Sequence, residues 1–209
     1  MNSDLLISRL ADDLKPMSRH RAAMRLALGV VAGAAVALLG AISVAGMPFS
    51  AIAITGIAPF AMKLAFTFAL TCVGAVVLFG VGRPGHDSGW GMAWLLAPFG
   101  VAGLAALLEV VQRTSADLLG SSWSMCLIAI SLMSLPVFTG VVWAFRSLAP
   151  TRLRLAGFLA GLLSGATAAL LYALYCQETT ASFLVTWYSL GILLVAAAGA
   201  LIGPQLLRW

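Results

Sequence analysis

Three cysteines, Cys72, Cys126 and Cys176, carry the most reactive side chains of this 209-residue chain. Cys126 begins one long apolar stretch and Cys176 follows the next, so both would lie at the same membrane face if each stretch forms a helix across the membrane. Two thiols there could form a disulfide in an oxidising compartment or bind a soft metal ion. Because the sequence does not give their Cα separation, two unrelated cysteines at the membrane surface are the alternative. Cys72 lies in the middle of a stretch, where a thiol serves as a small apolar filler.

The histidines and their neighbours give no pattern typical of an enzyme. His86 and Asp87 are adjacent in the turn-rich segment GRPGHDSGWG, and we interpret them as part of a polar turn. The chain has no paired-histidine metal motif, no phosphate-binding loop and no nucleophile elbow. We therefore expect no catalytic site and no cofactor.

Charged residues are scarce within the apolar stretches. Lys63 is expected at the outer start of the second stretch, and Glu109 near the outer end of the third. Glu109 could reach the membrane surface or pair with Arg113, four residues further along a helix. Ion-coupled transporters usually need charged groups near the middle of the membrane, and none is predicted there. A small transporter or channel is therefore the alternative function rather than the preferred one.

Six apolar stretches must position these residues, and they fill most of the chain. Hydrophobic residues make up 62% of the chain and charged residues 9%, whereas soluble domains contain about 25% charged residues. Each stretch has about 18–23 residues, enough for a helix to cross a hydrocarbon core of about 30 Å. We predict an all-α membrane protein with six transmembrane helices and short loops, at about residues 24–46, 64–81, 92–110, 125–145, 155–175 and 183–203.

The basic residues predict the orientation of these helices. If the N-terminus is cytoplasmic, the opposite side keeps only Lys63 and Arg113 of the 12 lysines and arginines. This is the positive-inside pattern, and six crossings return the C-terminus to the cytoplasm. The charge reports orientation, so we expect no direct nucleic-acid binding. The residues on the cytoplasmic side are Arg9, Lys15, Arg19, Arg21, Arg25, Arg83, Arg146, Arg152, Arg154 and Arg208.

Residues 1–23 form the only sizeable segment outside the apolar stretches, and residues 24–209 form the membrane domain. The segment SDLLISRLADDL has helical periodicity, because Leu6, Ile7, Leu10 and Leu14 share one face. Pro16 ends this helix. The segment could lie on the lipid headgroups or be disordered, but its acidic residues favour a groove on a protein partner. These acidic residues are Asp4, Asp12 and Asp13.

Small residues and one proline mark the expected helix contacts. Gly157, Gly161 and Gly165 recur at four-residue spacing, which lets helix backbones approach closely in lipid. We expect packing within the chain there, with a homo-oligomer through these glycines as the alternative. Pro136 is expected to kink the fourth helix, where Ser131 and Ser134 could satisfy freed backbone groups. With such short loops, neighbouring helices should pack as antiparallel hairpins.

Several motifs resemble those of one known family, the NrsF-type bacterial anti-sigma factors. The matching segments extend over the whole chain, and they are DLLISRLADDLKPM at the start, SSWSMC at 121–126, SLP at 134–136, YALYCQE at 172–178 and TWYSLGILLVAAAGALIGPQLLRW at the end. The TWYSLGI and terminal LLRW elements are fairly specific, whereas any membrane helix could supply the apolar stretches between the motifs.

The resemblance implies a membrane-bound anti-sigma factor in the bacterial inner membrane that sequesters an extracytoplasmic-function sigma factor. Its cytoplasmic N-terminal segment would bind the sigma factor, and Cys126 and Cys176 match the two outer-face cysteines implicated in the response to a signal. The first two transmembrane helices would relay that signal. The segment lacks the zinc-binding His/Cys signature of soluble anti-sigma domains. The residues expected to bind the sigma factor are Asp4, Leu6, Ile7, Leu10, Asp13 and Leu14.

Overall fold

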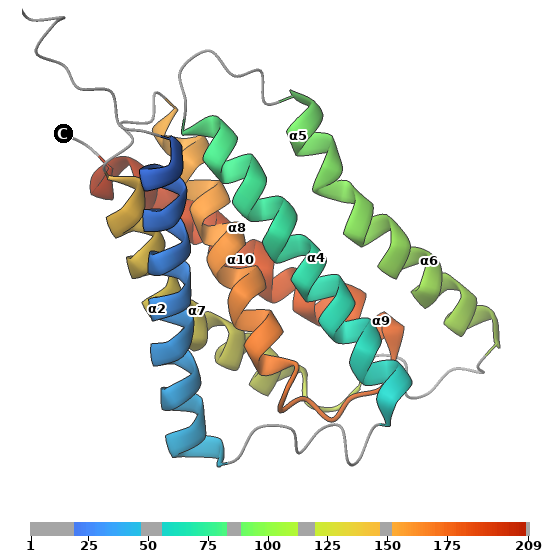
Figure 1. Ribbon diagram of the computed structural model, residues 1–209. Coiled ribbons are helices and arrows are strands. Elements are labelled where there is room, and N and C mark those ends of the chain that lie inside the picture. Colours follow the sequence, from blue (N-terminus) through green and yellow to red (C-terminus); the bar gives the residue numbers. More distant parts are fainter. Residues whose placement is uncertain (1–18, 47–55, 83–88, 113–119, 147–151, 208–209) are drawn as a thin grey trace, which may run out of the picture.

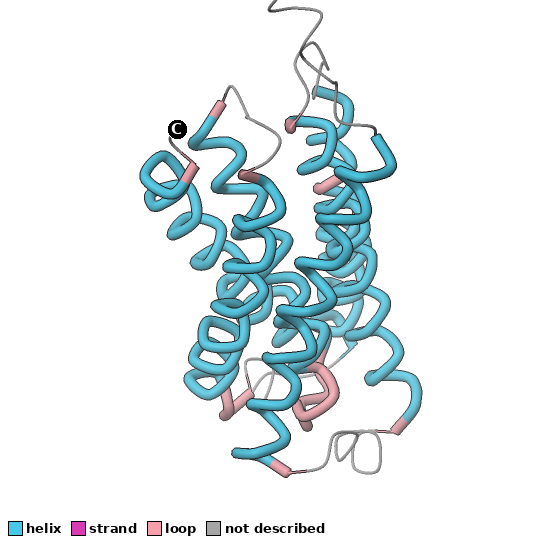
Figure 2. Tube along the Cα trace, turned by 60° about the vertical axis from the view of Figure 1, so that its left-hand side comes forward, coloured by secondary structure: helices cyan, strands magenta, loops and turns pink. Residues whose placement is uncertain are grey.

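The computed structural model describes residues 19–46, 56–82, 89–112, 120–146 and 152–207, and within them it contains helices and turns but no strand. Figure 1 shows the helices crossing the molecule in alternating directions, and Figure 2 shows the same bundle turned by 60°. The helices are α2 (Arg19–Ala45), α4 (Ile57–Val81), α5 (Gly89–Trp94), α6 (Leu96–Gln112), α7 (Trp123–Phe145), α8 (Leu153–Tyr172), α9 (Ala181–Phe183), the π-helix η1 (Leu184–Tyr188) and α10 (Ser189–Leu206).

Six helical spans in the described residues are long and apolar enough to cross a membrane. This confirms the predicted all-helical class and the number of spans. The helix boundaries differ from the prediction at two places that matter below. Helix α2 begins at Arg19 rather than at residue 24, and α4 begins at Ile57 rather than at residue 64. Pro59 is tolerated in α4 because the first turn of a helix has amide groups without partners in the helix.

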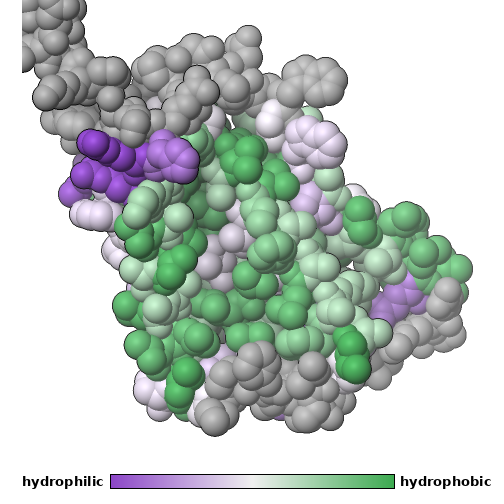
Figure 3. Space-filling model, viewed as in Figure 1, coloured by the Kyte–Doolittle hydropathy of each residue, from purple (hydrophilic) through white to green (hydrophobic). Residues whose placement is uncertain are grey.

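Helix α8 forms the centre of the bundle. It is buried along most of its length and contacts α10, α4 and α7. By contrast, α2 and α6 expose large apolar side chains such as Leu39 and Val101, which are 67% and 73% exposed. Such surfaces suit contact with lipid rather than water, and Figure 3 shows hydrophobic side chains over most of the visible face.

Close backbone contacts join α8 to α10. A Cβ atom added at Gly157 would collide with the carbonyl oxygen of Gly199, and one added at Gly161 would collide with that of Val195. A side chain at Gly165 would press against Ile192. The structure therefore assigns these three glycines to packing within the chain, as preferred above, and leaves no room at them for a second copy.

A second pair of helices, α2 and α7, packs in the same way. Gly29 of α2 lies against Gly140 of α7, and Gly33 lies against the backbone of Pro136 and Val137. Helix α2 therefore packs along α7 and α8, without extensive contact to α4, its neighbour in sequence. The expectation of antiparallel hairpins is right for α7 with α8 and for α8 with α10, but wrong for α2 with α4. The reason is that the glycines of α2 fit the backbone of α7.

Helix α7 runs through Pro136 without interruption from Trp123 to Phe145. The Ser134 hydroxyl donates to the carbonyl of Ser131 at 2.7 Å. The carbonyl that loses its amide donor to the proline is that of Leu132, so Ser134 satisfies a neighbouring group instead.

Candidate functional site at the cysteine end

The bundle has two ends of different character. The arginine end holds the start of α2, the end of α7, the start of α8 and the end of α10, with exposed Arg21, Arg25, Arg146, Arg152 and Arg154. The cysteine end holds the start of α4, the end of α6, the start of α7, the residues after α8, and α9 with η1. In Figure 1 the arginine end is at the top and the cysteine end is at the bottom.

Cys126 and Cys176 both lie buried at the cysteine end. Cys126 is in the first turn of α7 and has no exposed surface, and Cys176 follows α8 and is 3% exposed. Both are free thiols in one buried cluster, close enough to interact electrostatically. Cys72 is also a free thiol, but it is exposed on α4. The pair is thus brought together by the fold, and Cys72 does not belong to it.

Lys63 lies beside this pair, which corrects the prediction that it sits at the outer start of its helix. Because α4 begins at Ile57, Lys63 is on the second turn and its side chain is only 3% exposed. Its ammonium donates to the carbonyl oxygens of Cys176 at 2.6 Å and Glu178 at 2.7 Å. The cation therefore holds the backbone of the segment that carries one of the two thiols.

Glu178 fastens the same segment to the start of α7. Its Oε1 atom accepts hydrogen bonds from the amides of Ser121 at 3.2 Å and Ser122 at 3.3 Å, and from the Ser122 hydroxyl at 2.7 Å. The Ser122 carbonyl in turn accepts from the amide of Cys126 at 3.1 Å. These bonds connect the two cysteine-bearing segments.

Gly120 makes this approach of the two loops possible. Its φ angle is +62°, and an added Cβ atom would lie 2.6 Å from the Phe183 ring and 2.8 Å from the Glu178 carboxylate. A residue with a side chain would therefore be strained in its backbone and would also displace Glu178.

Aromatic residues pack in the same buried cluster as the thiols. Tyr188 is fully buried, lies 5.9 Å from Tyr172 between ring centroids, and has its hydroxyl beside Cys176 without hydrogen-bond geometry. It belongs to the π-helical segment η1, a distortion that is frequent at functional sites. Trp187 of the same segment stacks on Trp123 of α7, with ring centroids 5.3 Å apart.

Glu109 docks α6 at this end through contacts that the sequence did not predict. Its Oε2 atom accepts from the amides of Ala181 at 2.7 Å and Ser182 at 3.2 Å, so it caps the first turn of α9. The expected partner, Arg113, lies outside the described residues.

Tyr175 joins the end of α2 to the segment before Cys176. Its hydroxyl donates to the carbonyl oxygen of Gly46 at 3.3 Å. Burial raises the pKa of the Tyr175 phenol, so the group stays protonated and able to donate at neutral pH. The contact gives α2 a direct connection to the cysteine end.

The ligand set for a metal at this site is limited to the two thiols. Within the described residues, no group of three or more His, Cys, Asp or Glu side chains could hold a metal ion. The Lys63 ammonium also lies next to the thiols, where its charge opposes a cation. The soft-metal alternative at Cys126 and Cys176 would thus lack further protein ligands of these types.

Reasoning from the sequence missed three residues of this site: Lys63 as a buried group, Glu178 and Tyr188. Glu178 follows Cys176 by two residues, and this proximity was the available signal. A predicted helix that begins at Ile57 would have placed Lys63 inside the membrane helix rather than at its start. Tyr188 lies within the TWYSLGI motif, but that motif did not indicate its place beside the thiols, because this depends on the π-helical turn.

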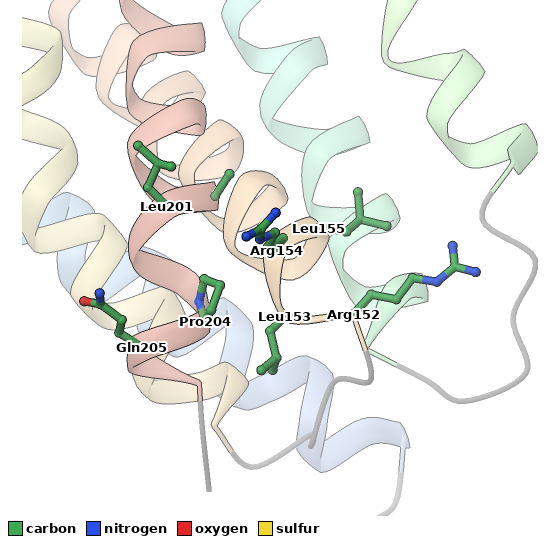
Figure 4. A pocket seen from close by; sticks show the side chains of 8 residues that line it. Arg152, Leu153, Arg154, Leu155, Leu201, Pro204 and Gln205 are labelled. Atoms are coloured by element: carbon green, nitrogen blue, oxygen red, sulfur yellow. The ribbon is translucent and has the colours of Figure 1, made fainter.

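The arginine end is open by comparison. Between the start of α8 and the end of α10 lies a hollow of about 1010 Å³, lined by Arg152, Arg154, Leu201 and Gln205 among others (Figure 4). Arg146 spans part of this end by donating from Nε to the Leu206 carbonyl at 3.0 Å. The residues predicted to bind the sigma factor lie outside the described residues, and these are Asp4, Leu6, Ile7, Leu10, Asp13 and Leu14.

Comparisons with known proteins identify the same family as the motifs SSWSMC, YALYCQE and TWYSLGI, which lie at the cysteine end. No solved structure matches the chain. The family model described as "NrsF: Negative regulator of sigma F" matches residues 10–209. The chain is 38% identical over 216 residues to the "Probable anti-sigma-F factor NrsF" of Azospira oryzae, and 36% identical over 217 residues to the "Anti-sigma-F factor NrsF" of Caulobacter vibrioides, each covering 100% of both chains. The chain therefore belongs to the NrsF family of negative regulators of sigma F.

Proposed function

We propose that this protein is a membrane-bound anti-sigma factor that sequesters an extracytoplasmic-function sigma factor through residues 1–23. The full-length match to relatives named as anti-sigma-F factors supports the regulatory role. The apolar face of Leu6, Ile7, Leu10 and Leu14 would supply the contact area. Asp4, Asp13 and their charged neighbours would set register and association rate more than affinity.

In this proposal the arginine end faces the cytoplasm and the cysteine end faces the periplasm of a bacterial inner membrane. The positive-inside rule supports this orientation, because the exposed arginines of the described residues gather at the end where α2 begins. The N-terminal segment then lies on the side of the membrane where sigma factors act.

The release step of the proposal begins at Cys126 and Cys176. A chemical change at these thiols, caused by a periplasmic signal, would shift the start of α7. One observation carries this step: α7, which begins at the sensing site, packs along α2, the helix that leads to the binding segment. To release the sigma factor, the change must lower its affinity by a coupling free energy, typically about 1–3 kcal/mol.

This relay differs from the one expected from the sequence. Helices α2 and α7, rather than the first two membrane helices, would carry the movement, because α2 has no extensive contact with α4. Helix α4 would act on the sensing site through Lys63 instead.

A pull-down from detergent-solubilised membranes tests the proposal. The intact protein is compared with a version that lacks residues 1–20, with recovery of the sigma factor as the readout. Recovery with the intact protein alone is the expected result. Equal recovery with both proteins would move the contact to the loops, and recovery with neither, from well-folded samples, would contradict the anti-sigma function.

A further inference from the structure

Lys63 is the one charged side chain among the described residues that is buried in the bundle. Burial of a charge is unfavourable unless hydrogen bonds compensate for the lost water. Here the ammonium donates to two backbone carbonyl oxygens, those of Cys176 and Glu178. A methionine would fill a similar volume without this penalty, so the observed lysine calls for an explanation beyond packing.

The two hydrogen bonds hold the backbone of one short segment, residues 176–178. Cys176 and Glu178 flank the exposed Gln177, so the ammonium grips the backbone around one exposed residue. This segment lies beyond the end of α8. The amide of Cys176 donates to the Tyr172 carbonyl at 3.0 Å, and beyond this hydrogen bond the helix no longer holds the segment. Lys63 and the Glu178 carboxylate then supply its polar attachments to other elements.

The lysine also comes from a helix that has no extensive contact with α7, which carries Cys126. Helix α4 packs on α8, α5 and α6 instead. Its buried ammonium nevertheless lies within electrostatic range of both Cys126 and Cys176. Lys63 therefore joins a third helix to the thiol pair.

We propose that Lys63 is a positioning residue that keeps the Cys176 segment closed over the thiol pair and so keeps the protein in its sigma-binding state. The inference rests on the proposed function for its regulatory part. Without the ammonium, the two carbonyls lose their donor and the segment opens. The thiols then become accessible, and the sigma factor is released without a signal.

The test measures thiol accessibility and sigma release in the same variants of the full chain. All variants carry Cys72→Ser, so that Cys126 and Cys176 are the remaining thiols. Lys63→Met removes the donor at similar volume, and Lys63→Gln keeps an amide that can donate to one carbonyl. Thr71→Val is the matched control, because its hydroxyl bonds only within α4, to the Thr67 carbonyl.

Membranes are treated with N-ethylmaleimide, and the labelling rate of each cysteine is followed by mass spectrometry. A sigma-dependent reporter is measured in cells. We expect Lys63→Met to raise the labelling rate of Cys176 at least about tenfold, with Lys63→Gln in between and Thr71→Val unchanged. The reporter should be active without a signal in Lys63→Met.

The outcomes separate this inference from the proposed function. Unchanged labelling in a monodisperse Lys63→Met protein would overturn the positioning role, whatever the reporter does. Faster labelling with a silent reporter would keep the positioning role but contradict the step in which opening of the Cys176 segment releases the sigma factor. If Lys63→Met is not recovered as a folded protein, the labelling rate of Lys63→Gln decides by the same criterion.

Discussion

The two ends of the bundle are built differently. At the cysteine end, hydrogen bonds donated by Lys63 and accepted by the carboxylates of Glu109 and Glu178 connect segments that lie up to 115 residues apart in sequence. At the arginine end, most charged side chains are exposed, and a hollow is lined by residues from the start of α8 and the end of α10. The first end is a closed junction in which a small chemical change disturbs many contacts. The second is an open surface that suits a partner.

In the proposed function, sensing and binding therefore use different residues. A buried site with fixed neighbours responds to few reagents, whereas the amphipathic helix predicted near the N-terminus would offer an apolar face to a protein. In the proposal, movement of α7 and α2 links the cysteine pair to the N-terminal segment. Substitutions can disrupt the cysteine pair, the helix contact or the binding segment separately.

The largest effect is expected from Leu10→Asp at the binding end. A carboxylate in the apolar face of the N-terminal segment should weaken sigma binding by at least about 2 kcal/mol, or about 30-fold. The membrane domain should unfold at the same temperature as the wild type. Ser8→Asp adds the same charge on the opposite face of the predicted helix and serves as the control. Sigma retention by Leu10→Asp in a pull-down would rule out this anchor.

The next effect concerns the cysteine end. Replacing Cys126 and Cys176 by serine should leave the sigma factor bound but abolish its release, since the coupling of about 1–3 kcal/mol is lost. A reporter assay with and without the inducing signal measures this change. Cys72→Ser is the control and should respond normally, because Cys72 is exposed and does not belong to the buried cluster that holds the pair. An unchanged response in the double variant would remove the cysteines from the mechanism.

Gly33→Leu tests the link between the two ends. The new side chain would collide with the backbone of Pro136 and Val137, so α2 must move away from α7. We expect a loss of about 1–3 kcal/mol in stability, measured by thermal unfolding in detergent, together with a weakened response. Gly40→Leu on the same helix is the control, because a Cβ atom there meets no neighbour within 4 Å. Equal melting temperatures for both variants would contradict the close packing of α2 on α7.

The smallest effect is expected from Glu109→Ala, which removes the cap on α9. The amides of Ala181 and Ser182 lose their acceptor, at a cost of about 1 kcal/mol. Hydrogen exchange of these two amides should become faster, whereas sigma binding should persist. Leu108→Ala is the neighbouring control, since Leu108 is 53% exposed. Faster exchange in the control as well would show that α6 docks by other contacts.

The number and character of the helices were predictable from the sequence because apolar stretches of sufficient length have few alternatives in a membrane protein. The arrangement of the helices was less predictable. Gly29 and Gly33 have the four-residue spacing that favours close helix contact, but the partner backbone, that of α7, is determined by shape and not by any local pattern. The expectation that α2 pairs with its sequence neighbour therefore failed.

The candidate site was predictable only in part for a similar reason. Cys126 and Cys176 were placed at one end by counting crossings, and this expectation agrees with their positions in the structure. The roles of Lys63 and Glu178 depend on how two loops approach each other, and Gly120 with its positive φ angle permits that approach. Such contacts between loops leave no periodic signal in a sequence.

The close backbone contacts at glycines, between α8 and α10 and between α2 and α7, restrict how the protein can deform. Because backbone meets backbone between α8 and α10, and again between α2 and α7, neither pair can repack by changing rotamers. Each pair is therefore a stiff body. Relative movement of the two pairs must then occur at the joint where one pair packs on the other, chiefly between α7 and α8. Spectroscopic labels for following release belong on either side of that joint, where relative displacement will be greatest.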